Sequence, residues 1–404
     1  MKQNRRKYIL VLIGMCGLLA SSVGVISNVA GLFFTSVAEE LNILKGSVSM
    51  TLTVTNLCFA LGGVFALRLI NENNLRPVLI AGTACIAGPT ALLGLSDNIL
   101  IMYVLNAVRG FAGGILGFVL VTTVINNWFY VSSGLAASAA MSCSGLAGAL
   151  LSPLLSAVIE YAGWRAGYFV SAAVILLFNL PAILFLPALD PRTKGILPYG
   201  CTVPITGSTQ TDKGDHRGTK VSGVLFAAVF AYAFLACSGT ALPQHFPGIT
   251  GFWGLSASTG AMMLSAGMIA NSTGKIIFGA LADRFGAKIS MLLYSVLAAA
   301  GTLLIWFVHK PAVMYAGACM YGMIYSLGIV AVVILTKDMF GLENYSRTYP
   351  VISLAGTVGS AVTAALIGFI FDLSGSYTAA LALMLSMILV NIMIILGCYR
   401  YRGK

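Results

Sequence analysis

The chain has 404 residues, of which 58% are apolar and only 9% are charged, and its mean hydropathy is +0.93. Soluble domains carry about 25% charged residues, so this composition excludes a water-soluble globule and indicates a membrane protein. The 23 basic residues exceed the 12 acidic ones, but they flank apolar runs, and we therefore expect no nucleic-acid partner.

Twelve apolar runs follow one another, each long enough to cross the hydrocarbon layer as a helix, which takes about 20 residues. The alternating segments of a membrane barrel are missing, so we predict an all-α membrane protein. A signal peptide is the alternative for the first run, but its length and the repeat described below favour an uncleaved span. The predicted spans cover residues 8–34, 47–70, 76–95, 99–125, 134–159, 166–188, 221–243, 255–281, 288–308, 311–336, 349–371 and 377–399.

Basic residues are distributed unevenly between the two sides of these spans. If the N terminus is inside, the two tails and the loops on that side hold 18 of the 23 basic residues. This is the positive-inside pattern, so we expect both termini in the cytoplasm. We expect a multi-pass protein of the cell membrane, specifically a bacterial plasma (cell inner) membrane, with the lipid bilayer as its surroundings. No feature requires an oligomer, and we expect a monomer.

The two halves of the chain share one period. The only long polar stretch, residues 190–220, is predicted to be a cytoplasmic linker between six-helix bundles at 1–189 and 221–404. A shift of 212 residues brings local features into register: Met102-Tyr103 with Met314-Tyr315, Gly110 with Gly322, Glu160 with Asp372, and Gly163 with Gly375. Parallel repeats of this kind place a binding site between the halves near the bilayer midplane, which indicates a transporter. A twelve-helix scaffold without a substrate is the alternative.

Three motifs carry a family resemblance. The segment Gly279-Ala-Leu-Ala-Asp283-Arg284-Phe-Gly286-Ala-Lys288 resembles the GxLxDRxGxK loop signature of the major facilitator superfamily. Arg109-Gly110 followed by Gly113-Gly114, and Gly163-Trp164-Arg165, are also similar to motifs of that superfamily. The resemblance implies a gating loop formed by Gly279, Asp283, Arg284 and Gly286. The first-half copy of this loop has lost the pattern, because Leu67, Asn71, Glu72 and Asn74 stand at the corresponding positions.

Two cations lie inside apolar spans. Arg109 is near the middle of the fourth span and Lys275 is inside the eighth, whereas all acidic residues lie near span ends or in loops. Burying either cation costs at least about 2.5–3.5 kcal/mol, so a negative partner is expected. With no mid-membrane carboxylate available, we predict that a transported anion supplies that charge. The alternatives are a structural role for Arg109 and snorkelling to the cytoplasmic interface for Lys275.

The eighth span resembles one group of transporters within that superfamily. Asn271-Ser-Thr-Gly274-Lys275-Ile-Ile-Phe-Gly279 is similar to the matching segment of monocarboxylate transporters and oxalate/formate exchangers, in which the cation binds a substrate carboxylate. Monocarboxylate transporters commonly have Asp where this chain has Asn271, a departure that argues against proton coupling through this pair. The second lysine of the oxalate exchangers, in the eleventh span, has no counterpart here.

The resemblance also implies that spans one, four, seven and ten line the cavity. Polar and aromatic residues on these spans are candidates for substrate contact, with packing between helices as the alternative for each of them. They are Asn28, Asn106, Tyr232, Tyr321 and Tyr325. An apolar wall with a few such donors suits a small organic anion.

The predicted function is therefore a secondary active or facilitative transporter of a small mono- or dicarboxylate that works by alternating access, with exchange (antiport) and facilitated diffusion both open. The alternative is a proton-coupled exporter of a neutral or cationic drug or metabolite. We expect no enzyme activity, no cofactor and no metal, because the chain has no catalytic cluster and its cysteines and histidines lack metal-ligand spacing.

Overall fold

The structure is a computed structural model that describes residues 2–130, 133–201 and 222–402. Helices account for all the regular structure in these ranges, apart from one isolated bridge between Phe129 and Tyr199. The prediction of an all-α membrane protein is confirmed. Much of the predicted linker, residues 202–220, lies outside the described residues.

The first half of the chain begins with a helix that changes its pitch. Its elements are α1 (Lys2–Leu19), the π-helix η1 (Ala20–Asn28), α2 (Gly31–Leu41), α3 (Lys45–Leu69), α4 (Leu75–Leu93), α5 (Ile99–Ile115), α6 (Phe118–Trp128) and α7 (Ser133–Phe185). The long α7 holds two predicted spans, because Gly163 takes a φ of +81° and breaks the helix there. A residue with a Cβ rarely adopts this conformation, so the sharp turn depends on glycine.

The second half has a comparable series of helices. Its elements are α8 (Gly223–Ser238), the 3-10 helix η3 (Gly239–His245), α9 (Phe246–Phe252), α10 (Ala257–Phe285), α11 (Ala287–Phe307), α12 (Pro311–Gly322), α13 (Ile324–Ser326), the π-helix η4 (Leu327–Ala331), α14 (Val332–Ser374) and α15 (Thr378–Arg402). Gly341, with a φ of +72°, breaks α14. Gly375, the repeat partner of Gly163, also has a positive φ, of +66°.

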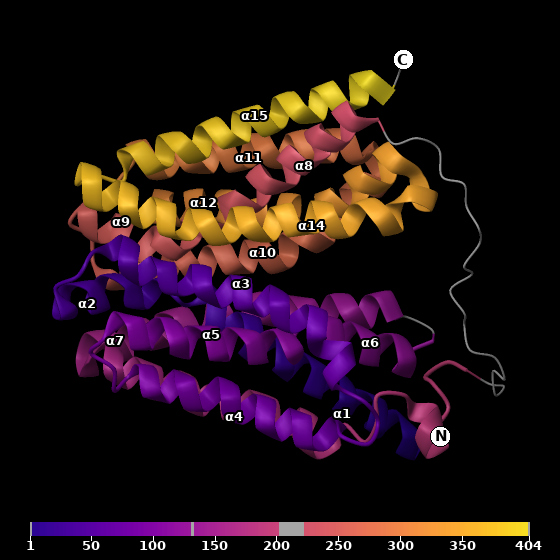
Figure 1. Ribbon diagram of the computed structural model, residues 1–404. Coiled ribbons are helices and arrows are strands. Elements are labelled where there is room, and N and C mark those ends of the chain that lie inside the picture. The colour runs from indigo at the N-terminus through magenta and orange to yellow at the C-terminus, as the bar shows by residue number, and fades with distance from the viewer. Residues whose placement is uncertain (1, 131–132, 202–221, 403–404) are drawn as a thin grey trace.

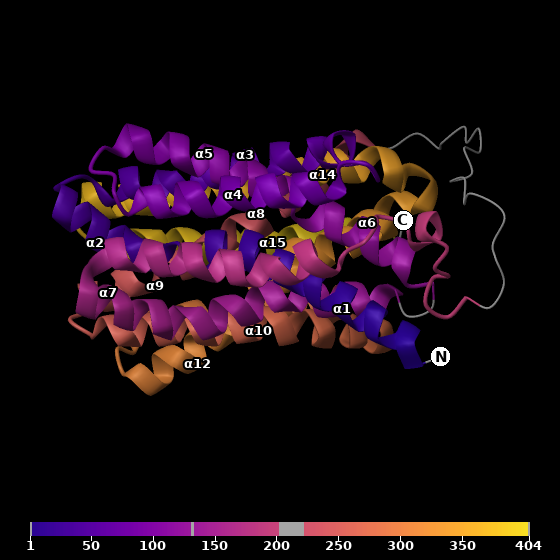
Figure 2. The same ribbon diagram turned by 90° about the horizontal axis from the view of Figure 1, so that it is seen from below.

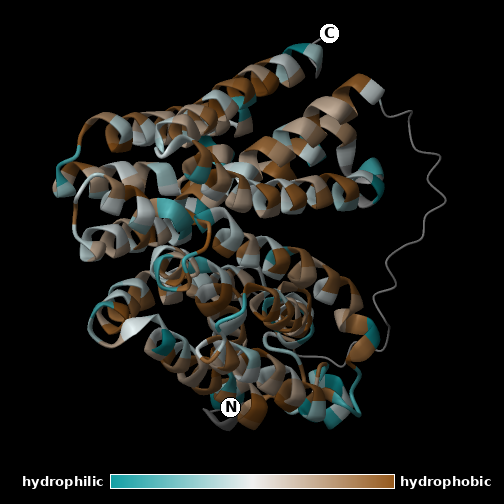
Figure 3. Cartoon of the chain, turned by 60° about the vertical axis from the view of Figure 1, so that its left-hand side comes forward, coloured by the Kyte–Doolittle hydropathy of each residue, from teal (hydrophilic) through white to brown (hydrophobic). Residues whose placement is uncertain are grey.

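Ten helical segments in the described ranges are long and apolar enough to cross a membrane. One of them, Ser133–Phe185, contains two crossings, and α10 is also long enough to cross but is more polar than the rest. Together these give the twelve predicted crossings. Hydrophobic residues dominate the helix bodies and hydrophilic residues gather mainly at the helix ends (Figure 3).

The helices of the two halves run side by side as two layers (Figure 1). Both chain termini lie at one end of the bundle, which we call the terminal end; the opposite end, near α2 and α9, is the distal end (Figures 1 and 2). A short 3-10 helix, η2 (Pro191–Lys194), follows α7 at the terminal end. Partial burial acts to raise the pKa of Asp190, which caps η2, but hydrogen bonds from Arg192 outweigh this effect and lower the pKa.

The halves meet along two seams. In the first seam α3 packs against α14, and the Thr53 hydroxyl donates a hydrogen bond to the Ala361 carbonyl. In the second seam α7 packs against α10, and the Ser265 hydroxyl donates to the Ala149 carbonyl at 2.7 Å. Figures 1 and 2 show α3 beside α14 and α7 beside α10. Hydrogen bonds between the described parts of the two halves all lie in the middle or toward the distal end.

Candidate functional site

Broken helices meet at the centre of the molecule. The first crossing changes from η1 to α2 around Asn28–Gly31, and its repeat partner contains η3 (Gly239–His245). The fourth crossing breaks between α5 and α6, and its repeat partner contains η4. The four predicted cavity helices are therefore all irregular in their middle parts. Interrupted helices expose backbone groups that can bind a substrate.

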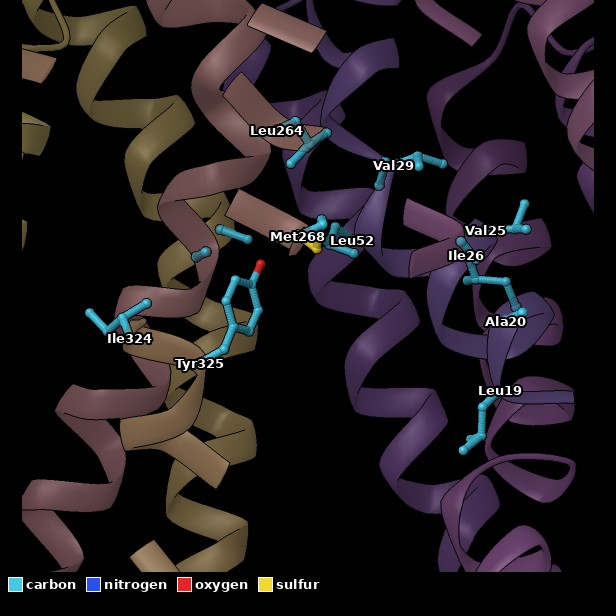
Figure 4. Packing of buried hydrophobic residues seen from close by; sticks show 14 of the residues in the cluster. Leu19, Ala20, Val25, Ile26, Val29, Leu52, Leu264, Met268, Ile324 and Tyr325 are labelled. Carbon is cyan, nitrogen blue, oxygen red and sulfur yellow. The ribbon is translucent and has the colours of Figure 1, made fainter. Parts of the chain in front are cut away.

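The halves touch through apolar side chains at this depth. Figure 4 shows Met268 of α10 beside Leu52 of the first half, with the Tyr325 hydroxyl pointing toward them and Leu264 farther along α10. All four side chains are buried, and Tyr325 is 7% exposed. This apolar plug closes the centre toward the distal end.

The three candidate tyrosines bond mainly within the second half. Tyr321 donates a hydrogen bond to the Gly239 carbonyl at 2.7 Å, and Tyr325 donates to the Thr240 carbonyl at 3.3 Å. Tyr232 is fully buried and donates a long hydrogen bond of 3.4 Å to Leu327. Tyr321 and Tyr325 therefore stabilise the irregular η3 backbone. Figure 4 shows the Tyr325 hydroxyl pointing toward the place where the halves meet.

Asn28 lies where the first crossing breaks. Its side-chain amide donates to the Ser144 carbonyl at 2.9 Å, and its own carbonyl accepts a hydrogen bond from Gln244 of the other half at 3.2 Å. Gln244 also accepts the Gly31 N–H at 3.1 Å. A Cβ at residue 31 would lie 1.7 Å from the Gln244 carbonyl oxygen, so glycine is required for this approach.

Gln244 is a functional candidate that the sequence interpretation missed. It joins the two halves through two hydrogen bonds at the break in the first crossing. A shift of 212 residues pairs it with Leu32, so a polar side chain stands where the first half has an apolar one. This difference between the repeats is the feature of the sequence that could have identified Gln244.

Asn106 takes part in a contact inside the first half. Its amide donates to the Met102 carbonyl at 2.7 Å, and its oxygen accepts the Thr55 hydroxyl at 3.0 Å. The side chain is completely buried. The bond from Thr55 joins α3 to α5. The two bonds together use both the oxygen and the N–H group of the Asn106 amide.

Asn271 and Lys275 share a stripe on α10. Residues three or four apart lie on one helix face, so Leu264, Met268, Asn271 and Lys275 face broadly the same way. Figure 4 shows that the first two of these face the centre. The Asn271 side-chain oxygen is buried without a hydrogen-bond partner among the described residues, and Lys275 has no carboxylate partner in that part of the chain.

Arg109 lies in a small cavity inside the first half. Its side chain is only 5% exposed, and its Nε has no hydrogen-bond partner among the described residues. The cavity has room for about one water molecule. It is lined by Val25, Ile26, Ala30, Phe33, Phe34, Thr51, Tyr168 and Ser171 together with Arg109.

The two cations inside the spans therefore occupy different places. The lining of the Arg109 cavity comes only from the first half, whereas Lys275 is on the centre-facing stripe of α10. Counting from the distal ends of α5 and α10, Lys275 is also about 12 Å nearer the terminal end. The structure does not bring them together around one space.

Comparison with family models shows to which family the chain belongs. The model of the Major Facilitator Superfamily matches residues 10–201 and 224–403. The chain belongs to this superfamily. Its architecture is similar to that of the nucleoside transporter NupG, in a crystal structure of a point mutant, with a TM-score of 0.74 at 11% identity, over 97% of this chain and 100% of that one.

Two curated proteins show sequence similarity to this superfamily member. The uncharacterized MFS-type transporter YcxA of Bacillus subtilis (strain 168) is 27% identical over 38% of this chain and 38% of its own length. The efflux pump alnA of Emericella nidulans is 28% identical over 45% of this chain and 31% of its own length. The matched regions thus span less than half of each relative.

The superfamily loop motif lies at the terminal end. Gly286 has a φ of +87°, which permits the tight turn between α10 and α11, and Gly279 lies on α10 two turns earlier. Asp283 is exposed and forms no ion pair within the described ranges. The Arg284 guanidinium lies over the Phe285 ring, 5.3 Å from its centroid. This loop therefore does not latch the halves together in this state.

The distal end does hold a latch between the halves. The Asp372 carboxylate accepts the backbone N–H groups of Lys45 and Gly46, at 3.1 and 2.6 Å, where α3 begins. Lys45 also lies over the Phe371 ring, 4.5 Å from its centroid. A carboxylate at a helix N-terminus satisfies free N–H groups and complements the helix dipole. No group of three potential metal ligands occurs among the described residues.

Proposed function

We propose that this protein is a secondary transporter that moves a small organic anion, a mono- or dicarboxylate, by alternating access, and that Lys275 provides the positive charge for the cargo. Superfamily membership supports a transporter rather than an enzyme. The observation that carries the choice of cargo is Lys275 on the centre-facing stripe of α10, without a carboxylate among its described neighbours. A cation inside a membrane span is stabilised when an anion binds beside it.

Lys275 lies well inside α10. It stands ten residues before the end of the helix, which corresponds to about 15 Å along its axis. Asn271, one turn earlier, has a side-chain oxygen with no partner among the described residues and an amide that can donate to a carboxylate. Together they offer a charge and a polar group on the terminal side of the apolar plug.

The closed distal end and the unlatched terminal loop indicate which access state this is. Gln244 and Asp372 hold the halves together toward the distal end, and at the other end Asp283 pairs with no described cation. Under the positive-inside rule the terminal end faces the cytoplasm. We therefore assign the conformation to the cytoplasm-facing state of the cycle, with the substrate path leading from the terminal end to Lys275.

Counterflow of labelled carboxylates in proteoliposomes tests the proposal. Lys275→Gln should abolish uptake because it removes the charge, whereas Lys275→Arg should retain part of it. Lys310→Gln, which removes an exposed lysine at the distal end, is the matched control and should transport normally. Full carboxylate uptake by Lys275→Gln would remove the lysine from the mechanism.

The same assay distinguishes the alternative cargo. Counterflow of neutral and cationic compounds, with and without a pH gradient, would identify the proton-coupled exporter suggested by the second prediction from sequence. One relative of the chain is named as an efflux pump, alnA, which is a reason to test export of such compounds. That name describes the relative and not this chain. We expect carboxylates, and not lipophilic cations, to drive counterflow.

A further inference from the structure

The Arg109 cavity has the properties of a separate ligand site. Arg109 is more than nine-tenths buried and lines a small cavity that has Tyr168 on its wall. No described residue accepts a hydrogen bond from the guanidinium, although this group has five N–H donors. The cavity therefore contains several N–H donors, and no described side chain supplies a hydrogen-bond acceptor for them.

The charge in this cavity is also uncompensated. None of the nine lining residues is acidic, and Arg109 forms no ion pair with any residue that the structure describes. A guanidinium stays charged in proteins, and a buried charge is costly unless an opposite charge meets it. A water molecule could hydrate the guanidinium, but it would not neutralise it.

The lining groups select the kind of anion. The Thr51 and Ser171 hydroxyls already donate to the carbonyls of Val48 and Gly167, whereas the Tyr168 hydroxyl makes no hydrogen bond to another described residue. The Tyr168 ring is held by stacking on Phe33, with 4.1 Å between ring centroids. Arg109 and Tyr168 thus remain as donors for one small acceptor.

We propose that this cavity binds a monatomic anion, specifically a halide such as chloride, between the Arg109 guanidinium and the Tyr168 hydroxyl. Room for about one water molecule excludes a carboxylate with its carbon skeleton, but it admits an ion slightly larger than water after small side-chain shifts. The apolar wall formed by residues such as Phe33 and Phe34 weakens screening and strengthens the attraction. The anion neutralises Arg109 within the first half and is distinct from the cargo at Lys275.

The thermal stability of the purified full-length protein tests this site without any transport assay. Potassium gluconate is replaced by potassium chloride or bromide at constant ionic strength, with no carboxylate substrate present. A ligand that binds only the folded state raises the unfolding midpoint in a saturable way. We expect this rise with chloride and bromide, and none with sulfate, which is too large for the cavity.

Two variants and one control locate the effect. Tyr168→Phe keeps the stacked ring, removes one donor to an ion and should weaken the apparent chloride affinity about tenfold. Arg109→Gln should lose the chloride response completely, and Arg76→Gln, which removes an exposed arginine of the same half, should keep it. If Arg109→Gln does not fold, the chloride affinity of Tyr168→Phe still tests whether the ion binds in this cavity.

Two results would overturn the halide site: an equal midpoint in gluconate and chloride for the wild type, or an unchanged chloride affinity in Tyr168→Phe. The first result would mean that water alone fills the cavity. Lys275→Gln separates this proposal from the proposed cargo, because it should keep the chloride response while losing carboxylate uptake. Loss of both properties would contradict the independence of the two sites.

Discussion

The distal corners of the two halves use different chemistry on the same backbone plan. In the first half, Arg165 forms ion pairs with Glu40 and Asp97 at 3.0 and 2.5 Å, and the Trp164 indole donates to Glu40 at 2.6 Å. The charged side chains of this charged corner are partly or largely exposed, by 37% for Arg165 and by 73% for Asp97, whereas the Trp164 ring is 2% exposed. The ion pairs are therefore in contact with water.

The matching corner of the second half is aromatic. A shift of 212 residues replaces Glu40, Asp97 and Arg165 by Phe252, His309 and Tyr377. The Tyr377 ring stacks on Phe371 with 4.4 Å between centroids and is 1% exposed, and His309 stacks on Trp253 at 4.1 Å. The glycine turns beside the two corners, Gly163 and Gly375, both keep a positive φ.

This comparison shows what the repeat conserves. Both turns contain a glycine with a positive φ, but ψ is 165° at Gly163 and 11° at Gly375. The side chains beside the turns have changed from ion pairs to aromatic rings, of which Tyr377 is buried. Exposed ion pairs contribute roughly 0–1 kcal/mol each, while a buried aromatic side chain contributes several times more. We therefore expect the second half to depend on its distal corner far more than the first half does.

Tyr377→Ala should have the largest effect. Removing this buried ring leaves a cavity beside Phe371 and should lower the free energy of unfolding by about 3–5 kcal/mol. Unfolding of the detergent-solubilised protein, followed by tryptophan fluorescence, measures the change. Tyr377→Phe keeps the ring and is the matched control. A loss below about 1 kcal/mol in Tyr377→Ala would show that the aromatic corner is not the stronger one.

The two seams between the halves also differ from each other. Asp372 accepts two N–H groups at the start of α3, but its repeat partner Glu160 is exposed and has no such bond in the described structure. The α3–α14 seam is thus latched at its distal end, and the α7–α10 seam is not. Opening of the distal end should accordingly be limited by the first seam.

Asp372→Asn should weaken this latch by an intermediate amount. Hydrogen bonds to a charged acceptor contribute about 1.5–3 kcal/mol, so losing the charge should shift the population toward the distal-open state by tenfold or more. Spin-label distances between the distal ends of α3 and α14 measure that shift. Glu160→Gln is the control for the unlatched seam. Equal shifts in the two variants would contradict the asymmetry.

Much of the fold follows from local sequence patterns. Apolar length and the need to satisfy backbone groups in lipid predict the helices, and Gly163 and Gly375 mark turns at corresponding positions of the two repeats. The eighth crossing shows the limit of hydropathy alone, since residues such as Asn271 and Lys275 make α10 more polar than the other crossings. Its length and the repeat identify it nonetheless.

The candidate site was less predictable, because its contacts join residues far apart in the sequence. The single positive charges of Arg109 and Lys275 stood out among apolar neighbours, but their separate locations depend on how helices pack. Gln244 bonds to Gly31 over 213 residues, and Asp372 bonds to Gly46 over 326. Neither pair belongs to a local motif, so only the folded arrangement reveals them.

Arg165→Gln should have the smallest effect and completes the comparison of corners. It breaks both exposed ion pairs and the contact of the guanidinium with the Trp164 ring, 4.2 Å from the centroid, yet water can solvate the groups that remain. We expect a loss of at most about 1 kcal/mol in unfolding free energy, and 1 M salt should reduce the difference from wild type further because it screens exposed charges. The same fluorescence assay at low and high salt measures both quantities. A salt-independent loss as large as that of Tyr377→Ala would mean that the charged corner stabilises its half through buried packing, and the contrast between the two corners would then disappear.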